Sequence, residues 1–192
     1  MKNNINLKST NMKQIIAILE DLFEDENKVY VSEEIKQRYY KLTGMKINKL
    51  YQYILEHYSD VFSNDGYGYK AIEKSPFSGD GLDSFSDFIG LTGDRNVFSE
   101  YEAYREQLPE GFYPIAHIDG GNLLCMESKT GNIYTWLHDE SESNCLFLAQ
   151  KSLEDFILNI VKDESDHDDN DSGIVSFHFS DELWDAIKNY KE

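Results

Sequence analysis

The sequence predicts an α+β fold in which helices pack around a central antiparallel or mixed sheet whose strands form a meander. Two observations lead to this prediction: apolar residues recur at helical spacing in the first third of the chain, and four short runs rich in aromatic and β-branched residues follow in the middle. Helices, then neighbouring strands, then a helix is the order of an α+β domain, unlike the alternation of a doubly wound nucleotide-binding fold. No proline-rich linker divides the 192 residues, so we expect a single domain, residues 1–192.

Three helices are expected in the N-terminal third. The first covers about residues 11–24, where apolar residues recur every three or four positions. The second begins after Ser32, a residue type that caps helix N-termini, and ends at Gly44. The third spans about residues 47–58, and the Asn-Asp-Gly sequence at 64–66 then favours a turn.

The meander is expected in the middle of the chain. Glycines divide the segment after residue 66 into a loop-rich connection with one or two short strands. Ser99 and Glu102 have the spacing of a capping box, which predicts a helix at about 99–107. Turn sequences then separate the four strands of the meander, at 112–118, 123–127, 133–137 and 146–149.

The C-terminal part is expected to return to helix. Ser152 and Asp155 again have capping-box spacing, and an apolar stripe continues the predicted helix through Ile160 and Val161. An acidic loop at 163–173 follows, and then a strand and a final helix within residues 174–190.

The charge of the chain excludes several classes of partner. It has 36 acidic and 18 basic residues, a formal net charge of −18 with histidine neutral. Binding to nucleic acid depends on clustered Lys and Arg that displace counterions from phosphates, and anionic membrane surfaces attract the same residues. We therefore expect neither a nucleic acid nor a membrane as a partner, and a basic protein surface instead.

The two cysteines, Cys125 and Cys145, lie in apolar runs and are expected to be small buried thiols. This usage is typical of a reduced, cytoplasmic compartment, and the first residues have no apolar stretch of signal-peptide length. No glycine-rich phosphate-binding motif is present, so we expect no cofactor.

Two histidines lie beside carboxylates. His138 precedes Asp139 and Glu140, and His117 lies close to Asp119, a pattern that is compatible with general acid/base chemistry in a hydrolase. No serine or cysteine has the context of a nucleophile, so the simpler interpretation is that hydrogen bonds satisfy both imidazoles.

Metal binding receives weak support from the sequence. The acidic loop at 163–173 resembles an EF-hand loop if Asp168 takes its first position, but Phe179 then stands where the bidentate Glu is required. The two cysteines and five histidines do not have zinc-site spacing. We therefore expect no metal site.

Five aromatic residues mark the glycine-rich connection. They either pin this connection to the core, which is the favoured interpretation, or stand exposed as anchors for a partner. The residues are Tyr67, Tyr69, Phe77, Phe85 and Phe88.

A family resemblance rests on the second half of the chain. A Leu-Pro turn leads into a Pro-Ile-Ala strand, glycine turns separate the next strands, an aromatic strand ends in Trp followed by His-Asp, and a Ser-capped helix closes the pattern. These positions are Leu108, Pro109, Pro114, Ile115, Ala116, Gly121, Asn122, Gly131, Trp136, His138, Asp139 and Ser152. The pattern resembles the SUKH superfamily, the Smi/Knr-type domains, over about residues 32–161. Ile47 and Asn48 depart from it, because a Leu-Pro commonly opens the second helix there.

This resemblance implies a protein-binding module without catalytic residues. Bacterial members are commonly immunity proteins that neutralise polymorphic or contact-dependent toxins, many of them nucleases, whereas fungal relatives regulate cell-wall synthesis and signalling. Together with the net charge of −18, this resemblance leads us to expect an immunity protein that binds a basic cognate toxin. The alternatives are an intracellular scaffold or regulator, and third a hydrolase that uses His138 and Asp139. The candidate contacts are the loop-borne acids Asp119, Asp139, Glu140 and Glu142.

Overall fold

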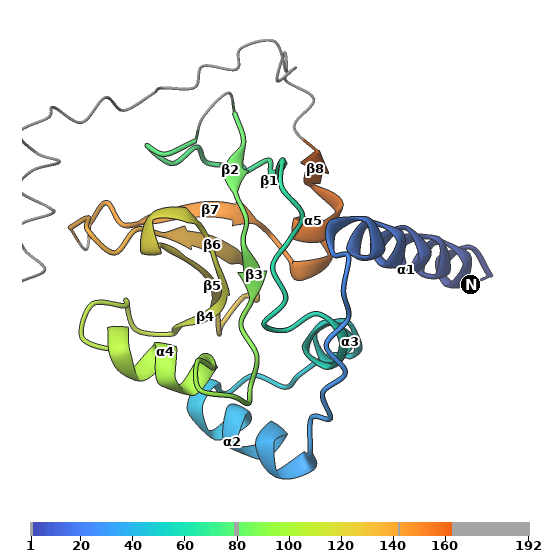
Figure 1. The fold of residues 1–192 in the computed structure, drawn as a ribbon, viewed down its shortest axis with the longest axis horizontal. Coiled ribbons are helices and arrows are strands. Elements are labelled where there is room, and N and C mark those ends of the chain that lie inside the picture. The colour runs from blue at the N-terminus through green and yellow to red at the C-terminus, as the bar shows by residue number, and fades with distance from the viewer. Residues whose placement is uncertain (1, 79–80, 142, 163–192) are drawn as a thin grey trace, which may run out of the picture.

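The larger of two sheets confirms the predicted α+β class. The computed structural model describes residues 2–78, 81–141 and 143–162. Five antiparallel strands follow the order β3-β4-β5-β6-β7, so strands adjacent in sequence are adjacent in space (Figure 1). They are β3 (Asp87–Phe88), β4 (Phe112–His117), β5 (Leu123–Glu127), β6 (Ile133–Trp136) and β7 (Leu146–Gln150). The predicted four-stranded meander is confirmed, with β3 added at its edge.

A second, smaller sheet has the order β2-β1-β8. Its antiparallel strands are β1 (Tyr67–Tyr69), β2 (Asp83–Ser84) and β8 (Ile160–Lys162). Residues 83–88, which we name the linking segment, carry the chain from β2 in the small sheet directly into β3 of the large sheet. Both sheets therefore share one short stretch of chain, which fixes their relative position.

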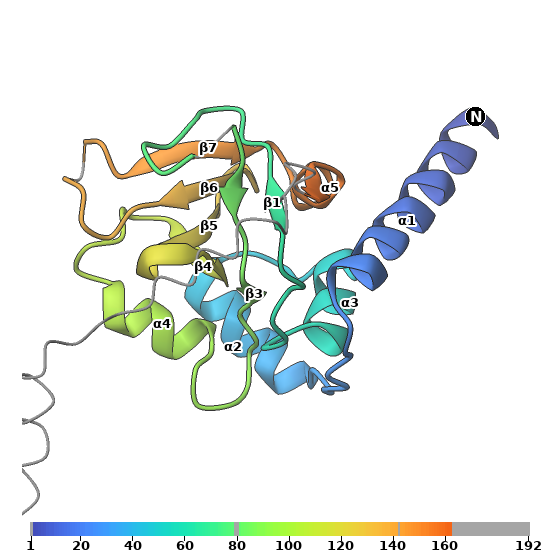
Figure 2. The ribbon, with the colours of Figure 1, turned by 45° about the horizontal axis from the view of Figure 1, so that its top comes forward.

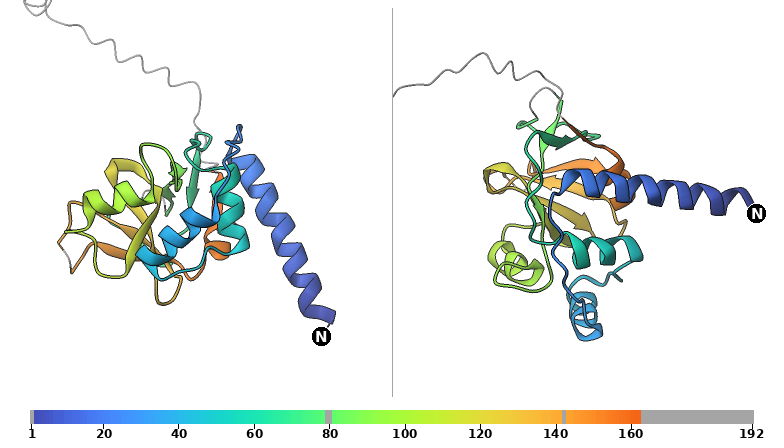
Figure 3. Two further views of the ribbon diagram at one scale, coloured as in Figure 1. Left: turned by 90° about the horizontal axis from the view of Figure 1, so that it is seen from below. Right: turned by 45° about the vertical axis from the view of Figure 1, so that its right-hand side comes forward.

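The helices are α1 (Lys2–Leu22), α2 (Glu33–Thr43), α3 (Lys49–His57), α4 (Val97–Tyr104) and α5 (Leu153–Leu158). The second is confirmed with both predicted ends: Ser32 Oγ accepts the Ile35 N–H, and Gly44 has φ +71°. Asn48 caps α3 in the same way. The first helix begins at Lys2, well before the expected start at about residue 11, and Figures 2 and 3 show its N-terminal half extending away from the rest of the fold.

Two predicted details of the helices are wrong. The cap of α4 is Asn96 instead of Ser99: the Asn96 side chain accepts the Ser99 N–H, and Ser99 Oγ accepts the Asn96 N–H in return. Ser99 thus belongs to a capping box, but as its third helical residue. At the other end of the chain, α5 stops at Leu158.

Ile160 and Val161 continue into β8 and not into the predicted helix. The Asn159 N–H still bonds to Asp155 O, whereas the Asn159 carbonyl accepts the Lys70 N–H, and Val161 then pairs with Gly68 of β1. The open edge of β1 provides backbone partners that compete with another helical turn. The predicted acidic loop at 163–173 and the strand and helix at 174–190 lie outside the described residues.

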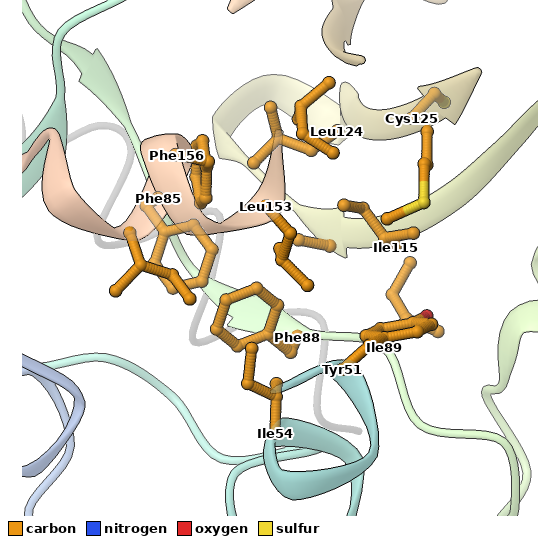
Figure 4. Packing of buried hydrophobic residues seen from close by; sticks show 14 of the residues in the cluster. Tyr51, Ile54, Phe85, Phe88, Ile89, Ile115, Leu124, Cys125, Leu153 and Phe156 are labelled. Carbon is orange, nitrogen blue, oxygen red and sulfur yellow. The ribbon is translucent and has the colours of Figure 1, made fainter. Parts of the chain in front are cut away.

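Helices α3 and α5 cover one face of the large sheet. Figure 4 shows their side chains gathered with those of β4 and β5 around Phe85 and Phe88, whose ring centroids lie 5.0 Å apart. Three of the five aromatic residues of the connection therefore pin it to the core, since Tyr69, Phe85 and Phe88 are buried. Phe77 is 68% exposed and contradicts the favoured interpretation at its position.

Both cysteines are buried, as expected. Burial raises the pKa of the Cys125 thiol, which keeps it protonated and unreactive. Within the described part of the chain, every helix is too short or too polar to cross a membrane.

Candidate functional site

Two loops carrying candidate contact residues lie at the same end of the large sheet. The β4–β5 loop contains Asp119 and the β6–β7 loop contains Asp139 and Glu140. In an antiparallel meander alternate connections meet at one end of the sheet, so the structure brings these acids to one end from positions about 20 residues apart. All three are exposed, and Asp139 has 84% of its side chain in solvent. Glu142 lies outside the described residues.

A buried amide, Asn122, ties the two loops together. Its Oδ1 accepts the His138 N–H at 3.2 Å and lies 3.1 Å from His138 Nδ1, while its Nδ2 donates to the Asp119 carbonyl at 3.1 Å. Gly120 and Gly121 have φ of +73° and +78°, so the turn between Asp119 and Asn122 needs glycine at both positions. The acids are therefore presented on a fixed frame. We name Asp119, Asp139 and Glu140 on this frame the acidic end.

The charges of the acidic end are not neutralised by neighbouring cations. Among the described residues, neither Asp119 nor Glu140 has a Lys, Arg or His partner within 4.0 Å, and Asp139 has only His138, with Nε2 at 3.0 Å from Oδ1. The ion pairs of the described chain lie elsewhere, for example between Arg95 and Glu100. A cluster of exposed carboxylates that have no Lys or Arg partner among the described residues projects a negative potential that suits a positively charged partner.

A cavity of about 250 Å³ opens beside Asp119, between the small sheet and the end of the large sheet. Phe77, Leu82, Ile118 and Leu137 make its apolar walls, and Asp83, Asp119, Asn122 and Thr135 are among its polar lining residues. Ser84 Oγ accepts the Asp119 N–H at 3.1 Å, so the linking segment holds the acidic end against this cavity.

Asp83 is the buried charged group of the cavity. Its Oδ1 accepts hydrogen bonds from Ser75 Oγ at 3.0 Å and Ser78 Oγ at 2.5 Å. It pairs in register with Tyr69, whose hydroxyl meets Thr135 Oγ1 at 2.8 Å in the sheet below. Burial raises the pKa of the Tyr69 hydroxyl, and the charge of Asp83, its register partner, raises it further.

The two histidines have hydrogen-bond partners, as the simpler interpretation expected. His117 Nδ1 lies 2.9 Å from Asp87 Oδ2, and Arg95 Nη2 lies 3.0 Å from His117 Nε2. Because Arg can only donate, Nε2 accepts and Nδ1 carries the hydrogen that is donated to Asp87. The hydrogen bonds of the described residues connect neither imidazole to a hydroxyl or thiol, so the geometry offers no activated nucleophile for a hydrolase.

A second group of acids, Asp60 and Asp87, lies around His117. Asp60 lies near Asp87 and Arg95, and its Oδ1 accepts the Gly90 N–H at 3.2 Å. Burial raises the pKa of Asp60, and the Asp87 charge adds to this. Within the described ranges, no group of three or more His, Cys, Asp or Glu side chains is arranged to hold a metal ion.

The sequence identified the exposed acids but missed the cavity. Asp83 stands in a glycine-rich stretch that reads as loop, and nothing in its neighbours signals that it is buried. Asn122 is recognisable in the sequence only as a motif residue, and its hydrogen bonds to two loops are not predicted. A cross-loop hydrogen bond has no periodic signature, so only the three-dimensional arrangement reveals it.

Comparison with known proteins confirms the family resemblance. The chain matches the model of the SMI1 / KNR4 family (SUKH-1) over residues 15–159. It is 34% identical over 119 residues to the SPbeta prophage-derived uncharacterized protein YokK of Bacillus subtilis (strain 168), covering 60% of this chain and 62% of that protein, less than two thirds of its length. No solved structure matches the chain. Because the family match spans well over half of the residues, from α1 through α5, the chain belongs to the SMI1 / KNR4 family (SUKH-1).

Proposed function

We propose that this protein is a non-enzymatic immunity protein that binds a basic cognate toxin through the acidic end and blocks it. The observation that carries the proposal is the set of exposed carboxylates that have no Lys or Arg partner among the described residues, Asp119, Asp139 and Glu140, held on a fixed frame in a member of this family. The formal net charge of −18 gives the whole molecule the same sign.

Electrostatics explains what such a surface achieves. Opposite fields accelerate encounter between proteins by about 10- to 1,000-fold at low salt. A toxin that grips phosphates needs a basic surface, and that surface is complementary to the acidic end. Occupying it excludes the nucleic acid substrate without any reaction, which agrees with the lack of an activated nucleophile near His117 and His138 among the described residues.

The similarity to a bacterial protein supports the immunity role over the regulatory role that the resemblance associates with fungal members. YokK comes from Bacillus subtilis, and its name describes it as prophage-derived. The resemblance associates bacterial members with toxin neutralisation and fungal members with cell-wall regulation. A gene for a large secreted protein with a variable C-terminal domain beside the gene of this chain is the genomic arrangement that we expect.

Co-expression tests the proposal directly. The C-terminal domain of that neighbouring secreted protein is produced in bacteria with and without this chain, and we expect growth to be rescued only when the chain is present. A variant with Asp119→Asn, Asp139→Asn and Glu140→Gln should lose protection. A matched variant that also removes three exposed charges, Glu34→Gln, Glu106→Gln and Glu110→Gln on α2 and before β4, should keep it.

Failure has a clear form. If wild-type protein does not rescue growth, and no complex forms at 0.15 M salt, where the Debye length is about 8 Å, the immunity role is wrong. If both triple variants lose protection equally, general charge and not the acidic end is responsible.

A further inference from the structure

We infer that the cavity beside Asp119 is an anchor pocket that receives one cationic side chain, a Lys or Arg of the partner, with Asp83 as its buried counter-charge. This inference rests on the proposed function and identifies the contact on which binding depends. Its basis is a buried carboxylate oxygen of Asp83 that has no hydrogen-bond donor among the described residues.

Asp83 is only 4% exposed, yet its Oδ2 has no hydrogen-bond partner among the described residues. Its other oxygen is held by Ser75 and Ser78, so the carboxylate cannot turn to share its donors between the two oxygens without losing a bond. No Lys, Arg or His lies within ion-pair distance of it in the described chain. A buried carboxylate is normally paired or fully hydrogen-bonded, so this site lacks a donor.

The cavity has the size of a side chain. About 250 Å³ is below the roughly 300–1,000 Å³ that is usual for small-molecule sites, and several times the roughly 30 Å³ of a water molecule. Phe77, Leu82 and Leu137 offer apolar surface for the methylene groups of a long side chain. Asp83 and Asp119 both belong to the lining, so their negative charges surround the space that the charged head would enter.

A cation fits these walls better than the other occupants. An apolar side chain would leave the second oxygen of Asp83 without a donor, and an anionic one would be repelled by both aspartates. Phe77, with 68% of its surface exposed at the wall of the cavity, offers an aromatic face on which an Arg or Lys can stack. Hot spots of protein interfaces combine this kind of pocket with a cationic or aromatic anchor.

The inference is tested without the toxin. The ¹⁵N-labelled full chain is titrated with N-acetyl-arginine amide and N-acetyl-lysine amide, and N-acetyl-citrulline amide serves as the neutral isostere of arginine. We expect at least one cationic probe to shift the amide signals of Asp83, Ser84 and Thr135 with millimolar affinity. The citrulline probe should bind at least tenfold more weakly. Equal binding of arginine and citrulline probes, or no shifts at these residues up to about 50 mM, overturns the inference.

Variants assign the binding to the pocket. Asp83→Asn should weaken the cationic probe at least tenfold, and Asp60→Asn, which removes a carboxylate from the other acidic group, should leave it unchanged. If Asp83→Asn disturbs the fold, the exposed Phe77→Ala provides the test, because it should weaken binding about threefold without affecting the core. Unchanged affinity in either folded variant contradicts the pocket.

The outcomes separate this inference from the proposed function. If co-expression rescues growth while the probes do not bind, the anchor pocket is wrong and the immunity role stands. If the probes bind but wild-type protein does not rescue growth, the cation site is supported and the immunity role is wrong.

Discussion

Asp83 and Asp87 lie four residues apart on the linking segment, and both are almost fully buried, with 4% and 7% exposure. Asp87 receives the N–H of His117, which Arg95 holds from its other side. Asp83 receives two hydroxyl groups on one oxygen and no donor on the other among the described residues. The fold therefore gives Asp87 an ionisable partner and leaves one oxygen of Asp83 without a donor among the described residues. We interpret Asp87 as a structural carboxylate and Asp83 as one that a partner can pair with.

The two aspartates face different surroundings because of sheet geometry. Asp87 pairs in register with His117, His117 with Leu123, and Leu123 with Trp136, so these side chains share one face of the sheet. Trp136 packs on that face against Tyr104 of α4, with ring centroids 5.2 Å apart. Thr135, one residue earlier in β6, points to the opposite face, where Asp83 and the cavity lie.

The largest loss of stability is expected at Asp87, whose carboxylate has a hydrogen-bond partner within the fold. Asp87→Ala removes the acceptor of the part-buried His117 Nδ1–H and leaves this ring nitrogen without its partner. We expect the free energy of unfolding in urea to fall by about 3 kcal/mol, the lower end of the range for breaking a buried polar pair. A loss below about 1 kcal/mol would show that water replaces the carboxylate and that the two aspartates do not differ.

Loosening the frame of the acidic end should have the next largest effect. Asn122→Ala removes the acceptor of the His138 N–H and the donor to the Asp119 carbonyl. We expect a loss of about 2 kcal/mol, because buried groups lose hydrogen bonds. Amide hydrogen exchange should accelerate in both loops. Faster exchange in only one loop would mean that Asn122 does not couple them.

Neutralising the incomplete aspartate should have the opposite sign. Asp83→Asn keeps an oxygen that accepts from Ser75 and Ser78 but removes a buried charge without a cation. We expect the free energy of unfolding to rise by about 1 kcal/mol, since removing uncompensated buried charge is neutral or stabilising. Clear destabilisation would mean that the charge of Asp83 already has a stabilising partner.

The smallest effect concerns Asp60, which has φ +59° and a raised pKa. The folded state holds the proton more tightly than the unfolded chain, so stability falls as pH rises from the unfolded pKa of about 4 through the folded value. Asp60→Asn has no such titration and suits a positive φ. We expect it to gain about 0.3 kcal/mol at neutral pH, allowing for solvent screening, and to lose this gain near pH 4. Urea unfolding between pH 4 and 8 checks the sign.

The sequence was sufficient for the parts of the fold that have a local signature. The capped helix Glu33–Thr43 and the meander strands were predicted because their caps, turns and preferred residue types are visible at neighbouring positions of the sequence. Ile160 and Val161 could not be assigned correctly, since their apolar spacing suits a helix and only the open edge of β1 draws them into a sheet. Ser99 belongs to a capping box, as its spacing suggested, but at N3, because Asn96 three residues earlier takes the cap position.

The candidate site likewise has a part that the sequence predicts and a part that it does not. Exposed acids such as Asp119 and Asp139 follow from their place in turns, and their meeting at one end follows from the meander. The surroundings of Asp83 include Ser75 and Ser78 from one turn and Thr135 from a distant strand. Local composition does not encode this convergence, so burial of an incomplete carboxylate becomes visible only in the folded chain.

One comparison of affinities tests the central claim most directly. Once co-expression identifies the toxin domain, calorimetry measures its binding to wild-type protein and to Asp83→Asn. We expect the variant to be at least as stable as wild type when free, and yet to bind the toxin domain at least tenfold more weakly. Equal affinity, with the variant folded, would contradict the claim that a partner cation completes Asp83.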